Sequence, residues 1–392
     1  MRDDLTAPDS APHVPPPNQT TSPTPWTSRG HPLVPAVPAR ADAALALGRR
    51  GLVGGVLSGL AAATLPAPAR AATLPAAEWE TFKSRFLAPD GRIVDNGNGG
   101  VSHSEGQGWG LIFAAAADDR AAFDRIQNWT AEALRRPNDS LHAWRWVPKD
   151  TPPVKDTNNA TDGDIFIAAG LARAGLQWGE PDRIQAAGAI ARDILRLLVK
   201  QAGPYTVLLP ALQGFTAKDA VVVNPSYYTF PFISELAAIV PSPVWATLRS
   251  DGLRLIDEGR FGPWALPPDW LRVAQSNGAL VPAPGFPSRF SFDAVRVPLW
   301  FGWAGLAGRP VCAAIDRFWS AYPMGSVPAW VDLRSNELAP YPLTVGMTAV
   351  MSALRQWLGQ PARPLPSIED ATKYYDAALV LLCRLALAEK TR

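Results

Sequence analysis

The chain has 392 residues, of which 47% are hydrophobic and 18% are charged, a composition typical of a globular protein with a sizeable core. Residues 1–71 carry six of the 37 Lys and Arg residues and four of the 35 Asp and Glu residues, which leaves the rest balanced at 31 of each. Because a phosphate backbone is bound by clustered positive charge, this balance excludes nucleic acid as an expected partner.

The first 71 residues predict a leader followed by an export signal. Ten of the 40 prolines fall before residue 39, in a stretch with too few large apolar residues to fold. A twin arginine, Arg49-Arg50, precedes a short apolar segment (51–65), and an A-x-A pattern at 69–71 predicts cleavage. The apolar segment is too short for a membrane span, so no membrane anchor is expected. We therefore expect a single domain over 72–392 that is exported to the periplasm or secreted.

Beyond the predicted cleavage point, apolar residues recur at three- and four-residue steps, which is the spacing of amphipathic helices. Ile184, Ala187 and Ala191 are one example. About eleven helices are predicted: 76–87, 105–117, 119–136, 162–178, 184–199, 230–239, 244–257, 293–306, 310–321, 343–358 and 368–389. The best strand candidates are 205–210 and 220–226. An all-α domain of paired helices predicts a closed toroid or a solenoid, and the lack of a fixed repeat weighs against the solenoid.

Several familiar sites are missing from the sequence. There is no G-x-S-x-G elbow and no Walker A loop, and "GQGWGL" misses the dinucleotide pattern because Leu111 replaces its last glycine. The four histidines lack metal-site spacing, so neither a metal nor a cofactor is expected. The sequence does not decide whether Cys312 and Cys383 form a disulfide or remain two buried thiols. What remains is carboxylates among aromatic residues, the chemistry of glycoside hydrolysis.

Glu105 lies in the first of three stretches with candidate carboxylates, "HSEGQGWGL". One reading is a capping box, in which Ser102 and Glu105 satisfy the free N–H groups of a helix start. The other is a general acid in a sugar-binding cleft. The glycines that follow would let a sugar ring approach the backbone closely.

Asp162 and Asp164 are the next candidates, in the first turn of the helix predicted over 162–178. There, carboxylates also favour the positive end of the helix dipole. Two residues apart on a helix, the side chains point about 200° apart, so only one of them can face a cleft.

Asp293 lies in the third stretch, "RFSFDAVRVPLW". Arg296 follows three residues later, and an ion pair between the two is the simplest interpretation of this spacing.

Together and in this order, the three stretches resemble glycoside hydrolase family 8. "ATDGDIFIAAGLARAGLQW" is similar to that family's signature, with departures at Gly170 and Ala172. "SEGQGWGL", "LHAWRW", "NPSYY" and "YPLTVGMTAV" also resemble family segments. The resemblance implies an (α/α)6 barrel and hydrolysis with inversion.

The resemblance also implies residue roles. Glu105 would be the general acid, Asp293 the general base, and Asp162 the carboxylate that binds and distorts the sugar at the cleavage point. Arg296 would orient Asp293 or the sugar, and Tyr227 would hold the water or the ring. Many relatives have Tyr at the position of Phe292, so any contact made by that hydroxyl is lost here. Three tryptophans are candidate stacking platforms, each weighed against core packing: Trp109, Trp144 and Trp146.

The function expected from this resemblance is an endo-β-1,4-glucanase acting on cellulose-like β-glucan, functionally associated with cellulose synthase. Chitosan, xylan and mixed-linkage glucan are the alternative substrates within the family. Chitosan would favour extra acidic residues, which the balanced charge argues against. A non-catalytic glycan-binding protein is the alternative from another class, and the three carboxylates count against it.

Overall fold

The computed structural model describes residues 74–390, and the predicted leader and export signal lie outside them. Eleven α-helices occur in this part of the chain, in agreement with the predicted number. They are α1 (Ala76–Phe86), α2 (Ser104–Ala116), α3 (Arg120–Ala133), α4 (Thr161–Trp178), α5 (Pro181–Asp193), α6 (Phe230–Ile239), α7 (Pro243–Glu258), α8 (Val297–Trp303), α9 (Pro310–Ser320), α10 (Val345–Trp357) and α11 (Tyr374–Lys390).

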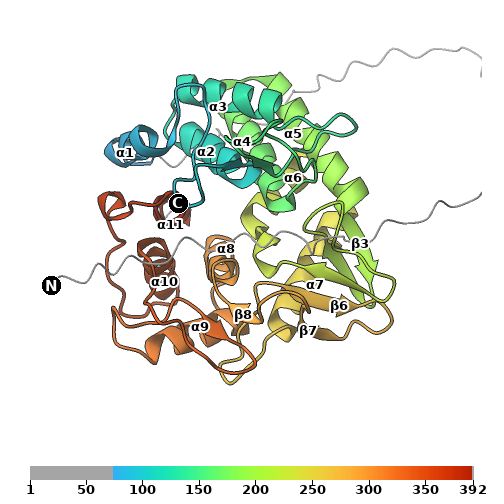
Figure 1. The fold of residues 1–392 in the computed structure, drawn as a ribbon, viewed down its shortest axis with the longest axis vertical. Helices are drawn as coiled ribbons and strands as arrows, with labels where there is room; N and C mark the ends of the chain where they lie inside the picture. Colours follow the sequence, from blue (N-terminus) through green and yellow to red (C-terminus); the bar gives the residue numbers. More distant parts are fainter. Residues whose placement is uncertain (1–73, 391–392) are drawn as a thin grey trace, which may run out of the picture. The chain divides into compact units, whose positions relative to one another are not determined.

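The helices pack as an (α/α)6 barrel, which confirms the predicted fold (Figure 1). Neighbouring contacts run in a closed circuit from α2 to α4, α6, α8, α10 and α11, and α11 packs back against α2. The remaining helices pack on members of this circuit: α1 on α11, α3 on α2, α5 on α4 and α6, α7 on α6, and α9 on α8 and α10. Because α2 and α11 meet, residues from the two ends of the described chain lie side by side.

Helix composition explains which helices lie inside. Twelve of the 13 residues of α2 are buried, and α4 is buried along most of its length. Both are rich in small and apolar residues on every side, as a helix surrounded by others must be. By contrast, α3 buries only one stripe, Ala122, Phe123, Ile126 and Thr130, and exposes its charged face.

Glycines bring α2 and α4 unusually close together. A Cβ on Gly108 would lie 2.5 Å from the Cβ of Phe166, and one on Gly170 would lie 2.6 Å from the Cβ of Leu111. The glycines of α2 were expected to leave room for a sugar. Instead each faces protein, and a Cβ on Gly106 would lie 2.9 Å from the hydroxyl of Tyr374. Their function in this fold is helix packing.

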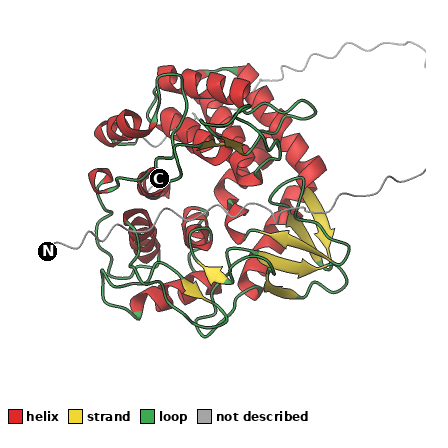
Figure 2. Ribbon diagram, viewed as in Figure 1, coloured by secondary structure: helices red, strands yellow, loops and turns green. Residues whose placement is uncertain are grey.

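Strands are short and lie in the connections between helices (Figure 2). The largest sheet is antiparallel and joins β5 (Ala220–Val223), β6 (Leu271–Ala274) and β7 (Leu280–Pro282), with Val221 opposite Val273. The hairpin of β3 (Val199–Ala202) and β4 (Tyr205–Leu208) turns at Gly203, whose φ is +55°. Two further pairs are β1 (Ser102–His103) with β2 (Arg145–Trp146), and β8 (Arg289–Phe290) with β9 (Val331–Asp332).

Three predicted helices differ most from the observed ones in their bounds. The helix predicted over 184–199 begins at Pro181, whose missing N–H suits a first turn, and ends in a π-helical turn, Ile194–Leu198. The one predicted over 293–306 is a 3₁₀ turn, Ala294–Arg296, followed by α8. The one predicted over 368–389 is a separate 3₁₀ turn, Ile368–Asp370, followed by α11. In each case apolar spacing continues across a break in the hydrogen-bond pattern.

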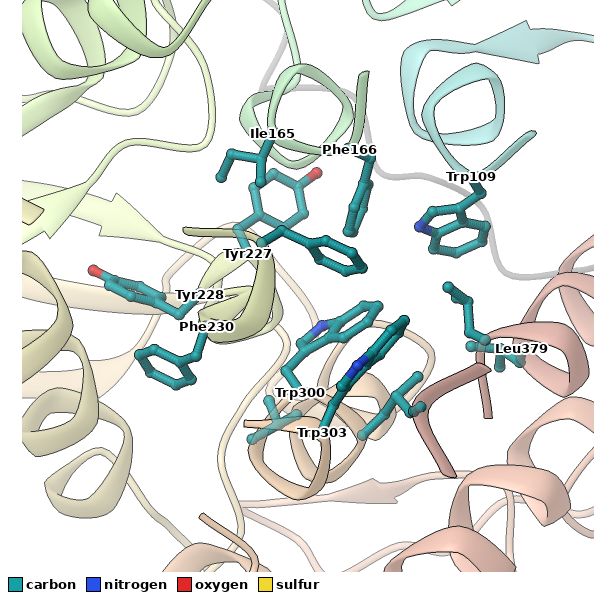
Figure 3. Packing of buried hydrophobic residues seen from close by; sticks show 14 of the residues in the cluster. Trp109, Ile165, Phe166, Tyr227, Tyr228, Phe230, Trp300, Trp303 and Leu379 are labelled. Carbon is teal, nitrogen blue, oxygen red and sulfur yellow. The ribbon is translucent and has the colours of Figure 1, made fainter. Parts of the chain in front are cut away.

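The core is aromatic where the inner helices meet. Figure 3 shows Trp109 and Trp300 beside Phe166, with ring centroids 5.7 and 5.6 Å from it.

Cys312 and Cys383 are buried free thiols, so the disulfide alternative is wrong, and burial raises the pKa of both. None of the helices described is long and apolar enough to cross a membrane.

Candidate active site

Glu105 lies in the first turn of α2, but the predicted capping box is wrong. The helix starts at Ser104, and its N-cap is His103, whose Nδ1 accepts the Gly106 N–H at 3.0 Å. Ser102 lies in β1 and donates its hydroxyl to the carbonyl of Ile93. The carboxylate of Glu105 is therefore not needed as a cap. It points instead to Arg296, with which it forms an ion pair.

Asp162 and Asp164 diverge as predicted. The side chain of Asp162 lies at the site, where Oδ2 is 3.6 Å from Nη1 of Arg296 and Oδ1 accepts the Gly163 N–H at 2.8 Å. Asp164 points away and holds the segment before the helix, accepting from the His142 N–H at 2.8 Å and from Nδ2 of Asn159 at 3.0 Å. Neither caps α4, whose N-cap residue is Ala160.

Asp293 and Arg296 form the ion pair that their spacing predicts. Nη2 of Arg296 lies 2.6 Å from Oδ1 of Asp293 and donates to the Ser226 hydroxyl at 3.0 Å. The Arg296 side chain is only 3% exposed. One buried guanidinium thus contacts all three candidate carboxylates, two through Nη1 and one through Nη2. This exceeds the predicted role, which was to orient Asp293 or the sugar.

Because three carboxylates share one guanidinium, excess negative charge remains in a buried site. Burial raises the pKa of Asp162 well above its usual range, and the charge of Glu105 raises it further, while Arg296 and the Gly163 N–H act in the opposite direction. Burial also raises the pKa of Tyr227, followed by the charges of Asp162 and Asp293. The Asp162 carboxyl therefore holds its proton to a higher pH than a free aspartate does.

His103 lies between Glu105 and Asp95, and the sequence did not single out either His103 or Asp95. His103 Nε2 lies 3.5 Å from Asp95, and Nδ1 lies 3.9 Å from Oε1 of Glu105. Burial lowers the pKa of His103, but the hydrogen bond to Asp95 and the charge of Glu105 outweigh it, and the net shift is upward. Ser226 was missed as well, although it precedes Tyr227 in the "NPSYY" segment.

The aromatic candidates fall in three different places. Trp109 is fully buried and packs on Phe166, so core packing is the alternative that the structure supports for it. Trp144 and Tyr227 line one pocket together with Trp270, and Nε1 of Trp144 donates to Asp156 at 2.8 Å. Trp146 lines another pocket, beside Trp129 and two prolines. Trp144 therefore remains the candidate for stacking against a sugar, because it lines the same pocket as Tyr227.

Within residues 74–390, no group of three or more His, Cys, Asp or Glu side chains is arranged to hold a metal ion. The centre of the carboxylate cluster is occupied by the guanidinium of Arg296.

Glu105 and Asp293 are two carboxylates that share a buried arginine in a helical barrel, and a pair of carboxyl groups is what a glycoside hydrolase uses for catalysis. The family model "Glycosyl hydrolases family 8" matches residues 55–389, and the chain belongs to this family. It is 46% identical over 336 residues to a "Probable endoglucanase" of Novacetimonas hansenii, covering 86% of this chain and 96% of that protein.

Solved structures agree with this assignment. The endo-β-1,4-glucanase CMCax from Acetobacter xylinum is similar with a TM-score of 0.77 and 46% identity, over 81% of this chain and 98% of that one. Endoglucanase Cel10 from Klebsiella pneumoniae, a family 8 glycosyl hydrolase, gives 0.76 and 38% identity, over 81% and 100%.

Proposed function

We propose that the protein is an exported endo-β-1,4-glucanase that hydrolyses internal bonds of cellulose-like β-glucan with inversion. The observation that carries the proposal is the meeting of Glu105, Asp162 and Asp293 on the guanidinium of Arg296. The names of the relatives, which are endoglucanases, support the substrate class.

In the proposed reaction, Glu105 donates a proton to the leaving glycosidic oxygen. Asp293 accepts a proton from a water that attacks the opposite face of the anomeric carbon. Asp162, buried beside Glu105, binds the sugar at the cleavage point and favours a distorted ring. When sugar enters, its hydroxyl groups replace some contacts of Arg296, which frees Glu105 to carry the proton that the cluster holds. Tyr227 lies within the field of Asp162 and Asp293 and contacts the ring or the water.

The alternatives differ in substrate and in class. Chitosan, xylan and mixed-linkage glucan remain the competing substrates. Chitosan is disfavoured because 31 acidic residues are balanced by 31 basic ones beyond residue 71. A glycan-binding protein without activity would not need three carboxylates around an arginine.

The test is hydrolysis of carboxymethylcellulose, followed by viscosity and by reducing ends, in parallel with chitosan, xylan and mixed-linkage glucan. Rapid viscosity loss with few new ends on carboxymethylcellulose is expected. Binding without new reducing ends would support the glycan-binding alternative instead. Proton NMR of early products tests the stereochemistry, and a β-configured product would rule out inversion.

Glu105→Gln is the matched variant for the acid role. Glutamine keeps the shape and can accept from Nη1 of Arg296, so the fold should persist. The kcat should fall about 10²- to 10⁴-fold, the usual contribution of a general acid. A folded variant that cuts at the parent rate would remove Glu105 from this role.

Export and a functional association with cellulose synthase are further parts of the proposal. They are supported by the signal pattern at 49–71 and by the resemblance to family 8. N-terminal sequencing of protein from periplasm and medium should find a chain that begins near Ala72, and an unprocessed cytoplasmic chain would contradict export. Disruption of the gene should alter the yield or fibre form of cellulose in a producing host, and an unchanged product would contradict the association.

A further inference from the structure

Asp293 does not sit on a long regular element. It lies between β8 and the 3₁₀ turn Ala294–Arg296, and its own side chain caps nothing. Its direction therefore depends on what holds the surrounding turn, residues 291–294. Two other side chains do this from different parts of the chain.

Asp269 holds one side of the turn. Its Oδ1 accepts the N–H groups of Ser291 at 3.0 Å and Ala294 at 2.8 Å, and its Oδ2 accepts the Ser291 hydroxyl at 2.5 Å. Its backbone N–H donates to the carbonyl of Arg289 at 2.7 Å. One residue 24 positions upstream thus fixes the backbone on both sides of Asp293.

Tyr375 holds the other side. Its hydroxyl donates to the carbonyl of Phe292 at 2.5 Å, from the first turn of α11. With Asp269 on the N–H groups and Tyr375 on a carbonyl, the turn that carries Asp293 is bound from both directions.

Asp269 is a costly choice for a purely structural clamp. It is 7% exposed and forms no salt bridge with any described Lys, Arg or His. Burial raises its pKa to about 7, and the charge of Asp293 adds to this, while the three hydrogen bonds oppose it. A neutral side chain would hold the same N–H groups without the cost of a buried negative charge. Asp269 lies close enough to Asp293 for the two charges to interact, so its role is sought in the placement of Asp293.

We propose that Asp269 is a positioning residue that aims Asp293 through the hydrogen-bonded turn 291–294. This rests on the proposed role of Asp293 as general base. Loss of the clamp lets the turn shift, and a displacement of about 1 Å of a catalytic group lowers the rate about 10²-fold without weakening substrate binding elsewhere in the cleft.

The structure contains a matched control. Asp332 accepts the N–H groups of Arg334 at 3.0 Å and Ser335 at 2.9 Å and the Ser335 hydroxyl at 3.1 Å, the same three kinds of donor, in a turn that carries no candidate catalytic residue. Asp332→Ala thus removes a similar set of hydrogen bonds from a turn that meets the segment of Asp293 only through the pairing of β8 with β9.

The experiment measures kcat, KM and thermal unfolding for Asp269→Ala, Asp269→Asn and Asp332→Ala on carboxymethylcellulose. Asp269→Ala should lower kcat about 10²-fold, with KM changed less than about threefold. Asp269→Asn should recover kcat to within about tenfold of the parent, because its amide oxygen still accepts both N–H groups. Asp332→Ala should lower the unfolding temperature and leave kcat unchanged.

Folded Asp269→Ala protein with parental kcat overturns the proposal, and so does an equal loss of kcat in Asp332→Ala, which would make the effect one of general stability. Asp293→Asn separates this failure from that of the proposed function. If that variant keeps the parental kcat, Asp293 is not the general base, and the positioning role proposed for Asp269 is wrong as well. If it is inactive while Asp269→Ala is fully active, only the positioning role falls.

Discussion

Arg296 and Glu105 lie 191 residues apart in the chain and meet as an ion pair at the end of the inner helices. The same guanidinium lies 2.6 Å from Asp293 and 3.6 Å from Asp162. Because three carboxylates share one cation, Arg296 is the electrostatic support of the site.

Arg296→Lys should therefore affect both activity and stability. A single ammonium group cannot span three carboxylates, so we expect kcat to fall at least about 10²-fold and the free energy of unfolding to fall by about 3–5 kcal/mol. Denaturant titration and steady-state rates measure the two effects.

Arg173→Lys is the control for Arg296→Lys. Arg173 lies between Glu235 and Glu389, at 2.6 and 2.8 Å, outside the site. It should cost stability and leave kcat unchanged. A parental kcat in Arg296→Lys would contradict the central role of the guanidinium.

Asp162→Asn should lower kcat and make the free energy of unfolding less dependent on pH. Because the folded-state pKa of Asp162 is raised, the folded protein binds more protons than the unfolded chain between pH 3.8 and that raised value. Its contribution to stability is full below pH 3.8 and is lost as the pH rises through the folded pKa. The variant lacks this loss, so its unfolding free energy should decline less between pH 4 and pH 8 than that of the parent, while kcat falls.

Urea unfolding at pH 4, 6 and 8 measures the predicted difference. Asp164→Asn is the matched control, because Asp164 lies two residues from Asp162 on the same helix. This substitution disturbs the contact of Asp164 with His142 and should leave kcat within about threefold of the parent. If Asp164→Asn abolishes activity and Asp162→Asn does not, the assignment of the two carboxyls is reversed.

Gly163→Ala should separate Glu105 from Asp162. The added methyl would overlap the Ser104 side chain and lie 2.7 Å from the Glu105 nitrogen, so α2 and α4 must move apart where the two carboxyls meet. We expect a loss of about 1–3 kcal/mol of stability together with a fall in kcat. Gly302→Ala on α8, whose added methyl would overlap the Trp357 ring on α10, should cost stability alone. Equal kcat values for the two variants would show that helix spacing at Gly163 does not set the site.

Trp109 and Trp144 should behave differently when truncated. Trp109→Ala empties a fully buried place in the core and should cost about 3–5 kcal/mol of unfolding free energy. Trp144→Ala alters the pocket shared with Tyr227 and should chiefly raise KM for long glucan chains. Calorimetry and steady-state kinetics distinguish the two. A raised KM with unchanged stability for Trp109→Ala would return that residue to the binding surface.

The sequence by itself predicted the number of helices, the approximate bounds of most of them and the three carboxylates that meet at Arg296. Helix positions follow from apolar spacing, which is a local property of the chain. The divergence of Asp162 and Asp164 likewise follows from the 100° step of a helix. The motifs around Glu105, Asp162 and Asp293 were specific enough to indicate family 8, to which the chain belongs.

Only the tertiary structure decided how these parts work together. His103 rather than Ser102 caps α2, because Ser102 is engaged by the carbonyl of Ile93 in a loop that the local pattern does not reveal. Arg296 reaches Glu105 and Asp162 across contacts that exist only once the ring of helices has closed. Asp269 reaches the turn around Asp293 because the connection that carries both folds back on itself. Distances between residues far apart in the chain depend on that closure, and no local spacing encodes them.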